Sequence, residues 1–250
     1  MSNLPSHASV VVIGGGIMGC STLYHLGKLG VSDAILLERN KLTSGTTWHS
    51  AAQVRALRNS QNLTRMIQYS VELYSQLEKE TGQNVGWIQK GSLSIATTAD
   101  RLIHIKRQEA LANAYGLDAT SISSGEALER WPMMNGDDVL GAVWSPDDGR
   151  VSPSDVCAAL IKGARKTDNQ IFENCGVSAV LTKNGKVVGV ETTAGTVMCD
   201  AIAICSGLWS REIGAMAGAE VPVLACEHFY LLTKPIDGIQ GNTPTLSDHD

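Results

Sequence analysis

A short apolar run followed at once by three glycines, near the start of the chain, is the feature that most constrains the fold. Residues 9–13 read SVVVI, and Gly14, Gly16 and Gly19 follow in a G-x-G-x-x-G frame. Apolar residues then recur at helical spacing, and a second apolar run occupies 34–38. A strand–helix–strand unit with glycines in its first turn predicts a parallel sheet and a helix N-terminus that binds an anion.

Glu38 ends the second run, 24 positions after Gly14. In dinucleotide-binding units a carboxylate about 20 residues beyond the first glycine accepts hydrogen bonds from a ribose. The same charge repels a 2′-phosphate, so the pattern favours the adenosine diphosphate part of FAD or NAD over NADP. A solvated carboxylate at a strand end is the simpler alternative for Glu38.

The rest of the chain alternates helical and strand patterns, which predicts a mixed α/β fold. Helices are expected over 63–79, 100–115 and 154–166, and behind a capping box formed by Ser123 and Glu126. Strands are expected over 92–97, 139–144, 179–182, 187–192, 197–198, 201–205 and 226–233, with turns at 184–185 and 194–195.

These elements predict a Rossmann-like nucleotide-binding domain interrupted by a smaller, incomplete α+β substrate-side region. We assign 8–52 and about 150–218 to the nucleotide-binding part. We assign about 60–145 and 221–250 to the substrate-side part. Because no terminal helix follows the last expected strand, we also expect the protein to continue beyond Asp250.

Charge and composition exclude several classes of function. The 20 Lys and Arg against 25 Asp and Glu give a net charge of −5, which argues against a nucleic-acid partner. The six Cys contain no Cys-x-x-Cys pair and the His residues lack metal-ligand spacing, so no metal site is expected. No charged leader precedes the first apolar run and no stretch reaches about 18 apolar residues, so we expect a cytoplasmic protein without a membrane span.

Several separated segments carry a family resemblance that runs from Val10 to the end of the chain. They read LERNKLTSGTTWHSA, ETGQNVGWIQKGSLSIATT, GAVWSPDDGRVSPSDVC, CSGLWSREIG and EHFYLLTKPIDGIQ. Together they resemble the sarcosine and dimethylglycine dehydrogenase family of FAD-dependent amine oxidoreductases. The residues after His49 read SAAQVRALR, where members of this family commonly continue with Ala-Gly-Leu.

The resemblance implies FAD, attached covalently to His49 through the 8α-methyl group of the flavin. Taken without the resemblance, His49 is more simply a polar loop residue, and Val177, where an adenine-contacting strand begins, is equally well a core valine. Trp209 is interpreted as a packing residue. The residues assigned to cofactor binding are Gly14, Gly16, Ile17, Met18, Gly19, Glu38, Arg39, Gly45, Thr46, Thr47, His49, Val177, Ser206 and Gly207.

Three further residues are candidates for substrate chemistry. The resemblance places His228 on a strand near the flavin, where it binds or deprotonates the amine; a buried strand histidine is the alternative. Arg55 and Arg58 follow His49 closely, and their guanidinium groups suit a substrate carboxylate. Two exposed loop arginines are the simpler interpretation of that pair.

The function implied is oxidation of a secondary or tertiary N-methyl amine of an amino acid, sarcosine or dimethylglycine, by hydride transfer to flavin. An electron-transfer flavoprotein or oxygen would then reoxidise the cofactor. A D-amino-acid or glycine oxidase-like activity is one alternative. A non-catalytic regulatory flavoprotein subunit is another.

Overall fold

The chain divides into two compact units in the computed structural model, which describes residues 4–239 and 241–248. The first unit contains the residues up to Ser50 together with Leu77–Asn84 and Pro153–Tyr230. The second contains Ala51–Gln76, Val85–Ser152 and the residues from Leu231 onward. Residues 221–230, predicted on the substrate side, therefore group with the first unit, and the predicted mixed α/β class is confirmed.

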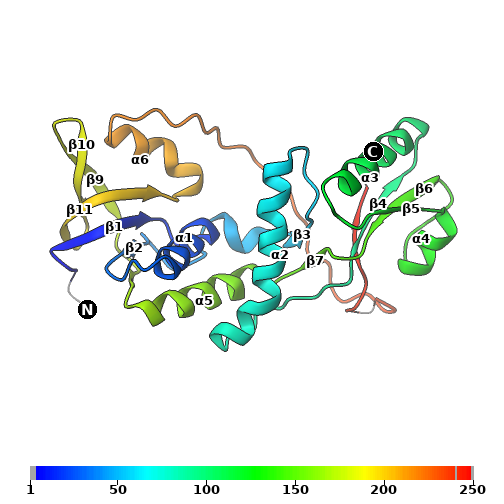
Figure 1. Ribbon diagram of the computed structural model, residues 1–250, viewed down its shortest axis with the longest axis horizontal. Coiled ribbons are helices and arrows are strands. Elements are labelled where there is room, and N and C mark those ends of the chain that lie inside the picture. Colours follow the sequence, from blue (N-terminus) through cyan, green and yellow to red (C-terminus); the bar gives the residue numbers. More distant parts are fainter. Residues whose placement is uncertain (1–3, 240, 249–250) are drawn as a thin grey trace. The chain divides into compact units, whose positions relative to one another are not determined.

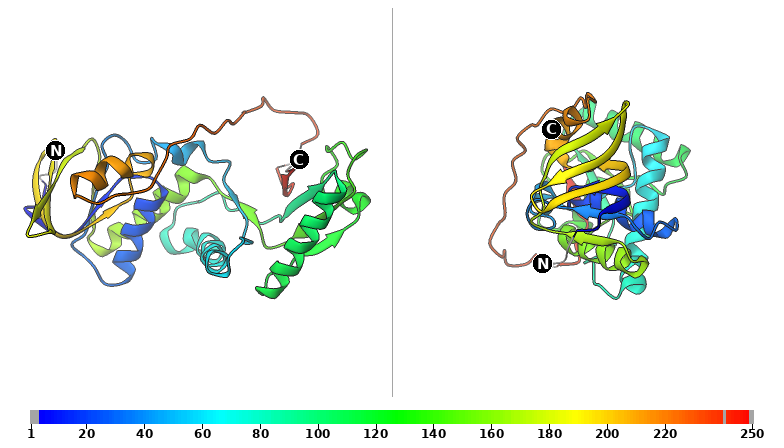
Figure 2. Two further views of the ribbon diagram at one scale, coloured as in Figure 1. Left: turned by 90° about the horizontal axis from the view of Figure 1, so that it is seen from above. Right: turned by 90° about the vertical axis from the view of Figure 1, so that its left-hand side faces the viewer.

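The first unit is built on a six-stranded sheet in the order β8-β2-β1-β11-β10-β9. Four neighbouring strands are parallel, and β10 and β9 complete the sheet in antiparallel fashion (Figure 1). Figure 2, right, shows β9, β10 and β11 in yellow beside β1 in blue. The bounds are β1 His7–Ile13, β2 Ile35–Leu37, β8 Gln170–Phe172, β9 Val177–Lys183, β10 Lys186–Thr192 and β11 Gly195–Ile204.

Two turns shape the antiparallel part of this sheet. Asn184 and Gly185 have φ of 53° and 73°, as a two-residue hairpin requires, which confirms the predicted turn. The next turn lies at 193–194, one residue earlier than predicted. The two short strands predicted at 197–198 and 201–205 are one strand, β11, because Met198 pairs with Gly189 on one side and with His7 on the other.

Helices α1 Ile17–Lys28 and α5 Pro153–Ala164 pack together beside this sheet (Figure 1). The short helix α6 Ser210–Met216 follows β11, and 3₁₀ turns occupy Thr46–His49, Arg165–Thr167 and Gly207–Trp209. Buried apolar residues of the strands and of α6 form the core, among them Val11, Ile35, Val190, Val197 and Ile213.

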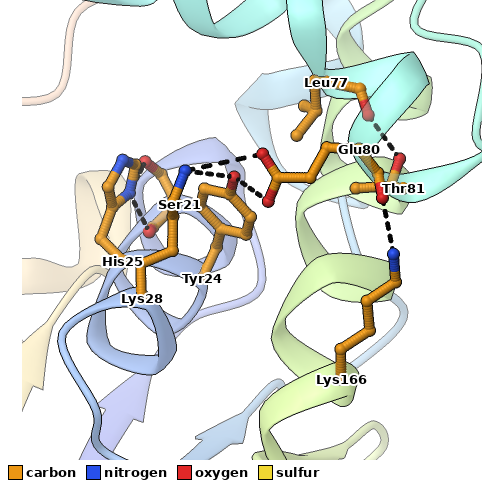
Figure 3. Close-up of polar contacts among 8 residues, drawn as sticks. All are labelled: Ser21, Tyr24, His25, Lys28, Leu77, Glu80, Thr81 and Lys166. Atoms are coloured by element: carbon orange, nitrogen blue, oxygen red, sulfur yellow. Dashed lines mark hydrogen bonds and ion pairs between the residues drawn. The ribbon is translucent and has the colours of Figure 1, made fainter.

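The last turn of α2 Gln61–Thr81 belongs to the first unit and is held there by polar contacts (Figure 3). Tyr24 donates to Glu80 Oε1 at 2.6 Å, and Lys28 Nζ lies 3.5 Å from Glu80 Oε2. Lys166 donates to the Glu80 carbonyl at 2.6 Å, near the negative end of the helix dipole. Burial, then the hydrogen bond to Glu80, raises the pKa of Tyr24 to about 12.

The second unit contains a four-stranded sheet in the order β12-β4-β6-β5 and a two-stranded pair, β3 with β7. Helices α3 Ala99–Ala114 and α4 Ser124–Arg130 flank these strands in sequence, and α4 begins with the predicted capping box. The strand bounds are β3 Gln53–Val54, β4 Ser92–Ala96, β5 Thr120–Ile122, β6 Gly141–Ser145, β7 Gly149–Arg150 and β12 Thr245–Ser247.

The strands β4 and β12 differ strongly between their two faces. Leu93, Ile95 and Leu246 pack into an apolar cluster on one face. In the ladder Thr245 lies opposite Ser92 and Ser247 opposite Ser94. Because side chains alternate along a strand, these four hydroxyl groups share the other face.

The prediction of a strand at 226–233 is wrong. The residues described between α6 and β12 contain neither strand nor helix, and Phe229, Leu231 and Leu232 are more than four-fifths exposed. A strand is stabilised by a hydrogen-bonded neighbour, and none of the described strands pairs with this segment. Strands β3, β5, β7, β8 and β12 and helix α6 were not predicted from the sequence, since each is short.

Candidate functional site

The glycines between β1 and α1 let three pieces of backbone approach one another closely. Gly14 has a φ of +112°, and a Cβ there would lie 2.5 Å from the carbonyl oxygen of Cys205. A Cβ on Gly19 would overlap the Gly14 carbonyl oxygen. The N-terminus of α1 therefore packs directly against the ends of β1 and β11. A residue larger than glycine at position 14 or 19 would prevent this close packing.

The N-terminus of α1 is suited to an anion. No side chain caps it at Gly16, and its first turn has no acidic residue. The amide of Ile17 donates to the Thr47 hydroxyl at 3.0 Å, which ties the helix to the 3₁₀ turn that ends at His49. The helix dipole and its first amides favour negative charge at this place.

Glu38 lies beside the glycine loop, and backbone amides hold its carboxylate. The Gly15 amide donates to Oε2 at 2.7 Å, and the Asn40 amide donates to Oε1 at 2.8 Å. Each carboxylate oxygen has a further lone pair, so the group can still accept from a hydroxyl of a ligand. The turn thus orients Glu38 before any ligand binds.

A cavity of about 470 Å³ opens at this end of the sheet. That volume lies within the range of cofactor pockets, about 300–1,000 Å³. Its walls come from four parts of the first unit: the glycine loop with the start of α1, the segment after β2, the start of β9, and the segment from the end of β11 through α6. Lining residues include Gly14, Gly16, Ile17, Met18, Glu38, Arg39, Gly45, Thr46, Thr47, Val177, Ser206, Gly207 and Trp209.

Arg39 and Trp209 form a stacked pair in the cavity wall. The Arg39 guanidinium carbon lies 3.9 Å from the centre of the Trp209 ring, within the range of a cation–π contact. Sequence reasoning assigned Trp209 to packing only. Its place two residues after Gly207 was the available signal that it would reach the same cavity.

His49 is exposed at the end of the 3₁₀ turn and does not line the cavity, although Gly45, Thr46 and Thr47 do. Its Nδ1 lies 3.3 Å from the Gly45 carbonyl oxygen, and its ring is 3.6 Å from that of Trp48. Since a carbonyl only accepts, this contact requires a proton on Nδ1, and in that neutral tautomer Nε2 carries the lone pair.

His228 is exposed and lies in the segment without regular structure after α6. The structure does not bring it to the cavity of the first unit. Its neighbours Phe229 and Leu231 are exposed as well. Because 226–233 is not a strand, it does not place His228 beside the cofactor site as predicted.

The two candidate arginines, both in the second unit, have different surroundings. Arg55 is half-buried and donates to the hydroxyls of Ser94 and Ser247, the latter at 2.7 Å. The pKa of Arg55 is lowered by burial, and the nearby carboxylate of Asp148 opposes this shift without reversing it. Arg58 is exposed and donates to the carbonyls of Arg55 and Leu57. Arg55 is thus held in a buried polar network, whereas Arg58 reaches solvent.

All six cysteines are free thiols, four of them buried. Among the described residues no group of three or more His, Cys, Asp and Glu side chains is arranged to hold a metal ion. No helix in this part of the chain is long and apolar enough to cross a lipid bilayer.

Residues 9–250 match the family described as FAD dependent oxidoreductase. The chain belongs to this family. It is 43% identical over 99% of its length to the mitochondrial sarcosine dehydrogenase of Mus musculus, and it covers 27% of that protein. It is also 43% identical over 99% of its length to the mitochondrial pyruvate dehydrogenase phosphatase regulatory subunit of Mus musculus, of which it covers 28%.

Among solved structures, the L-proline dehydrogenase from P. horikoshii is similar, with a TM-score of 0.87 and 26% identity. The match covers 98% of this chain and 65% of that one. The chain spans little more than a quarter of the length of the two curated relatives, the sarcosine dehydrogenase and the phosphatase regulatory subunit. The family supports FAD as the cofactor, and the glycine loop and its cavity fit this cofactor.

Proposed function

We propose that the protein oxidises the N-methyl amine of a small amino acid, sarcosine or dimethylglycine. The observation that carries this proposal is the cavity at the N-terminus of α1, with its glycine loop and the oriented Glu38. The 43% identity to a sarcosine dehydrogenase supports the substrate class. When bound, FAD would accept a hydride equivalent from the N-methyl C–H bond, and the oxidised amine would hydrolyse to release formaldehyde.

Different residues of the first unit would bind different parts of FAD. Gly14, Gly16 and Gly19, with the amide of Met18, would hold the pyrophosphate, and Ile17, whose amide donates to Thr47, would line its site. Glu38 would accept from the ribose, and Arg39 would lie beside the adenosine. The backbone of Val177 would pair with an adenine edge, while Gly45, Thr46, Thr47, Ser206 and Gly207 would line the path of the cofactor.

We propose that His49 is the covalent anchor, bonded to the 8α carbon of the flavin. The hydrogen bond from Nδ1 to the Gly45 carbonyl supports this role, since it leaves Nε2 free to attack. Neutral imidazole is the form that can form such a bond.

His228 remains our proposal for the group that binds and deprotonates the substrate amine, because a protonated amine cannot donate a hydride. Arg58 is the proposed partner of the substrate carboxylate, since its side chain is exposed and donates to backbone carbonyls through Nη1, whereas both Nη1 and Nη2 of Arg55 donate to serines. His228→Ala should keep the flavin and slow its reduction by at least about 10²-fold. Unchanged reduction would remove His228 from catalysis.

The experiment for the function itself is anaerobic mixing of the FAD-loaded protein with sarcosine and with dimethylglycine. The oxidised flavin absorbance should bleach with at least one of them. Bleaching only by glycine or a D-amino acid would instead indicate an oxidase-like activity on an unmethylated amine.

A second candidate function is a non-catalytic regulatory flavoprotein subunit, favoured by the 43% identity to a phosphatase regulatory subunit. It predicts FAD binding with no bleaching by any amine. The electron acceptor, an electron-transfer flavoprotein or oxygen, and the cytoplasmic location remain predictions; the two curated relatives are both named as mitochondrial.

A further inference from the structure

Asp148, Gly149 and Arg150 form a junction in the second unit that the proposed function does not use. Arg150 donates to the carbonyls of Thr243, at 2.8 Å, and Gly241. Gly149 pairs with Val54 of β3. This triplet, called here the DGR junction, therefore joins β7 to β3 and to the segment that leads into β12.

Asp148 is the centre of this junction and is only 4% exposed. Its Oδ1 accepts from the Ala56 amide at 2.8 Å, and its Oδ2 accepts from the Ser92 hydroxyl at 2.6 Å. Its carbonyl accepts from the Gly91 amide at 2.9 Å. One buried carboxylate thus ties the segment after β3 to the strand β4.

Gly149 makes this close approach possible. A Cβ at that position would lie 2.6 Å from the Ile88 carbonyl oxygen and 2.8 Å from the Trp87 ring. Any side chain would push β7 away from these residues and move Asp148 with it.

The segment 54–58, which the DGR junction holds, is fixed at each residue. Val54 pairs with Gly149, Arg55 donates to Ser94 and Ser247, and the Ala56 amide donates to Asp148. Leu57 packs against an apolar cluster of the second unit.

Arg58 ends this segment, and its backbone is fixed by the buried Thr64. The Arg58 amide donates to Thr64 Oγ1 at 3.0 Å, and the same hydroxyl donates to the Arg58 carbonyl at 3.2 Å. The Arg58 side chain is exposed, unlike that of Arg55. The guanidinium is held by Nη1, which donates to the carbonyls of Arg55 and Leu57, so the fixed backbone also sets the place of this exposed group.

We propose that Asp148 is a positioning residue for recognition of the substrate carboxylate: it holds the backbone of 54–58 so that Arg58 presents its guanidinium in a fixed place. This role rests on the proposed function. Asp148 itself does not touch substrate. It acts through the Ala56 amide and the Ser92 hydroxyl, which are both donors and need an acceptor on each carboxylate oxygen.

The test compares Asp148→Asn with Asp147→Asn in the intact FAD-loaded protein. Both variants remove one carboxylate, but Asp147 is exposed. Asp148→Asn replaces the charged acceptor of the Ala56 amide by an uncharged amide oxygen and places an NH2 donor opposite the Ser92 hydroxyl, which can then no longer donate to it, so both bonds are weakened. Asp148→Asn should raise KM for sarcosine by about 10-fold, because the two charge-assisted hydrogen bonds that hold 54–58 to β4 are weakened.

The expected change is confined to carboxylate recognition. The kcat should stay within about 3-fold, and the inhibition constant of N-ethylmethylamine, in which a methyl group replaces the carboxylate, should not change. Asp147→Asn should leave all three constants unchanged. An unchanged KM in Asp148→Asn, or an equal rise in KM and in the inhibition constant, would overturn the proposal.

Trypsin provides a second measurement that needs no enzymatic activity. Cleavage after the exposed Arg58 should be faster in Asp148→Asn than in Asp147→Asn, and equal rates would overturn the proposal. If Asp148→Asn does not fold, Ser92→Ala replaces it and should raise KM by a smaller factor. If the wild type oxidises no N-methylated amino acid, the proposed function fails, and the cleavage rates still decide whether Asp148 holds 54–58.

Discussion

The cavity of the first unit and the DGR junction of the second unit are built from different kinds of groups. Backbone dominates the cavity: Gly14 and Gly19 allow close approach, and backbone amides orient Glu38. Side chains dominate the junction and the segment that it holds, where the buried Asp148 and the half-buried Arg55 make the linking hydrogen bonds. The cavity depends on the lack of side chains at its glycines. The junction also needs Gly149 without a side chain, but it depends in addition on each donor and acceptor of its side chains.

This difference predicts opposite sensitivities. Adding a single methyl group should damage the first region most. Removing one polar group should damage the second most.

The largest effect is expected from Gly19→Ala. The new Cβ would overlap the Gly14 carbonyl oxygen, so α1 must move away from β1. We expect a loss of at least about 3 kcal/mol in the free energy of unfolding, together with loss of FAD binding. Urea denaturation and flavin content measure both.

Gly125→Ala is the matched control, since a Cβ at Gly125 in α4 would meet nothing closer than 4.0 Å. Alanine favours a helix over glycine, so this variant should be unchanged or slightly more stable. A Gly19→Ala protein that binds FAD as the wild type does would show that close approach is not what the cavity requires.

Arg55→Ala should destabilise the second unit by about 2–4 kcal/mol, because the hydroxyls of Ser94 and Ser247 lose their donor and a half-buried side chain is removed. Arg58→Ala should change the free energy of unfolding by less than about 1 kcal/mol, as surface substitutions do. Urea denaturation of the two variants gives the comparison. Equal losses would contradict the assignment of Arg55 to structure and Arg58 to substrate.

Glu38→Ala should weaken FAD binding by about 1–3 kcal/mol, the size of a lost charge-assisted hydrogen bond. The measurement belongs in a His49→Ala background, where no covalent bond hides the loss, and is made by FAD titration. Glu191→Ala, which removes an exposed carboxylate from β10 of the same sheet, is the control. An unchanged affinity would remove Glu38 from the ribose.

The smallest effect is expected from Tyr24→Phe, which removes the hydroxyl bonded to Glu80 at 2.6 Å and should cost about 0.5–1.5 kcal/mol. The pKa of Tyr24 is raised from 10.0 to about 12, so its contribution is complete below pH 10 and is lost as the pH rises through 12. Unfolding followed between pH 9 and pH 12 should show a shallower loss in Tyr24→Phe. The same slope in both proteins would contradict the raised pKa of Tyr24, to which burial contributes most and the Glu80 contact next.

The sequence predicted those parts of the molecule that depend on local backbone chemistry. The spacing of Gly14, Gly16 and Gly19 predicted the turn between β1 and α1, and Asn184-Gly185 predicted a hairpin. The strand at 226–233 was wrong because an apolar run shows only that a strand is possible, while pairing depends on residues far away in sequence. Asp148 has partners 56 and 92 positions away, a combination that no local pattern reveals.

The most direct test of the central claim, that the first unit holds FAD with His49 as its anchor, is acid precipitation of the FAD-loaded protein. A histidyl bond survives denaturation, whereas nucleotide contacts do not. We predict that the yellow colour stays in the pellet of the wild type and moves to the supernatant in His49→Ala. Colour that moves entirely to the supernatant in the wild type would contradict the covalent anchor, and a protein that takes up no FAD in either form would contradict the cavity as its site.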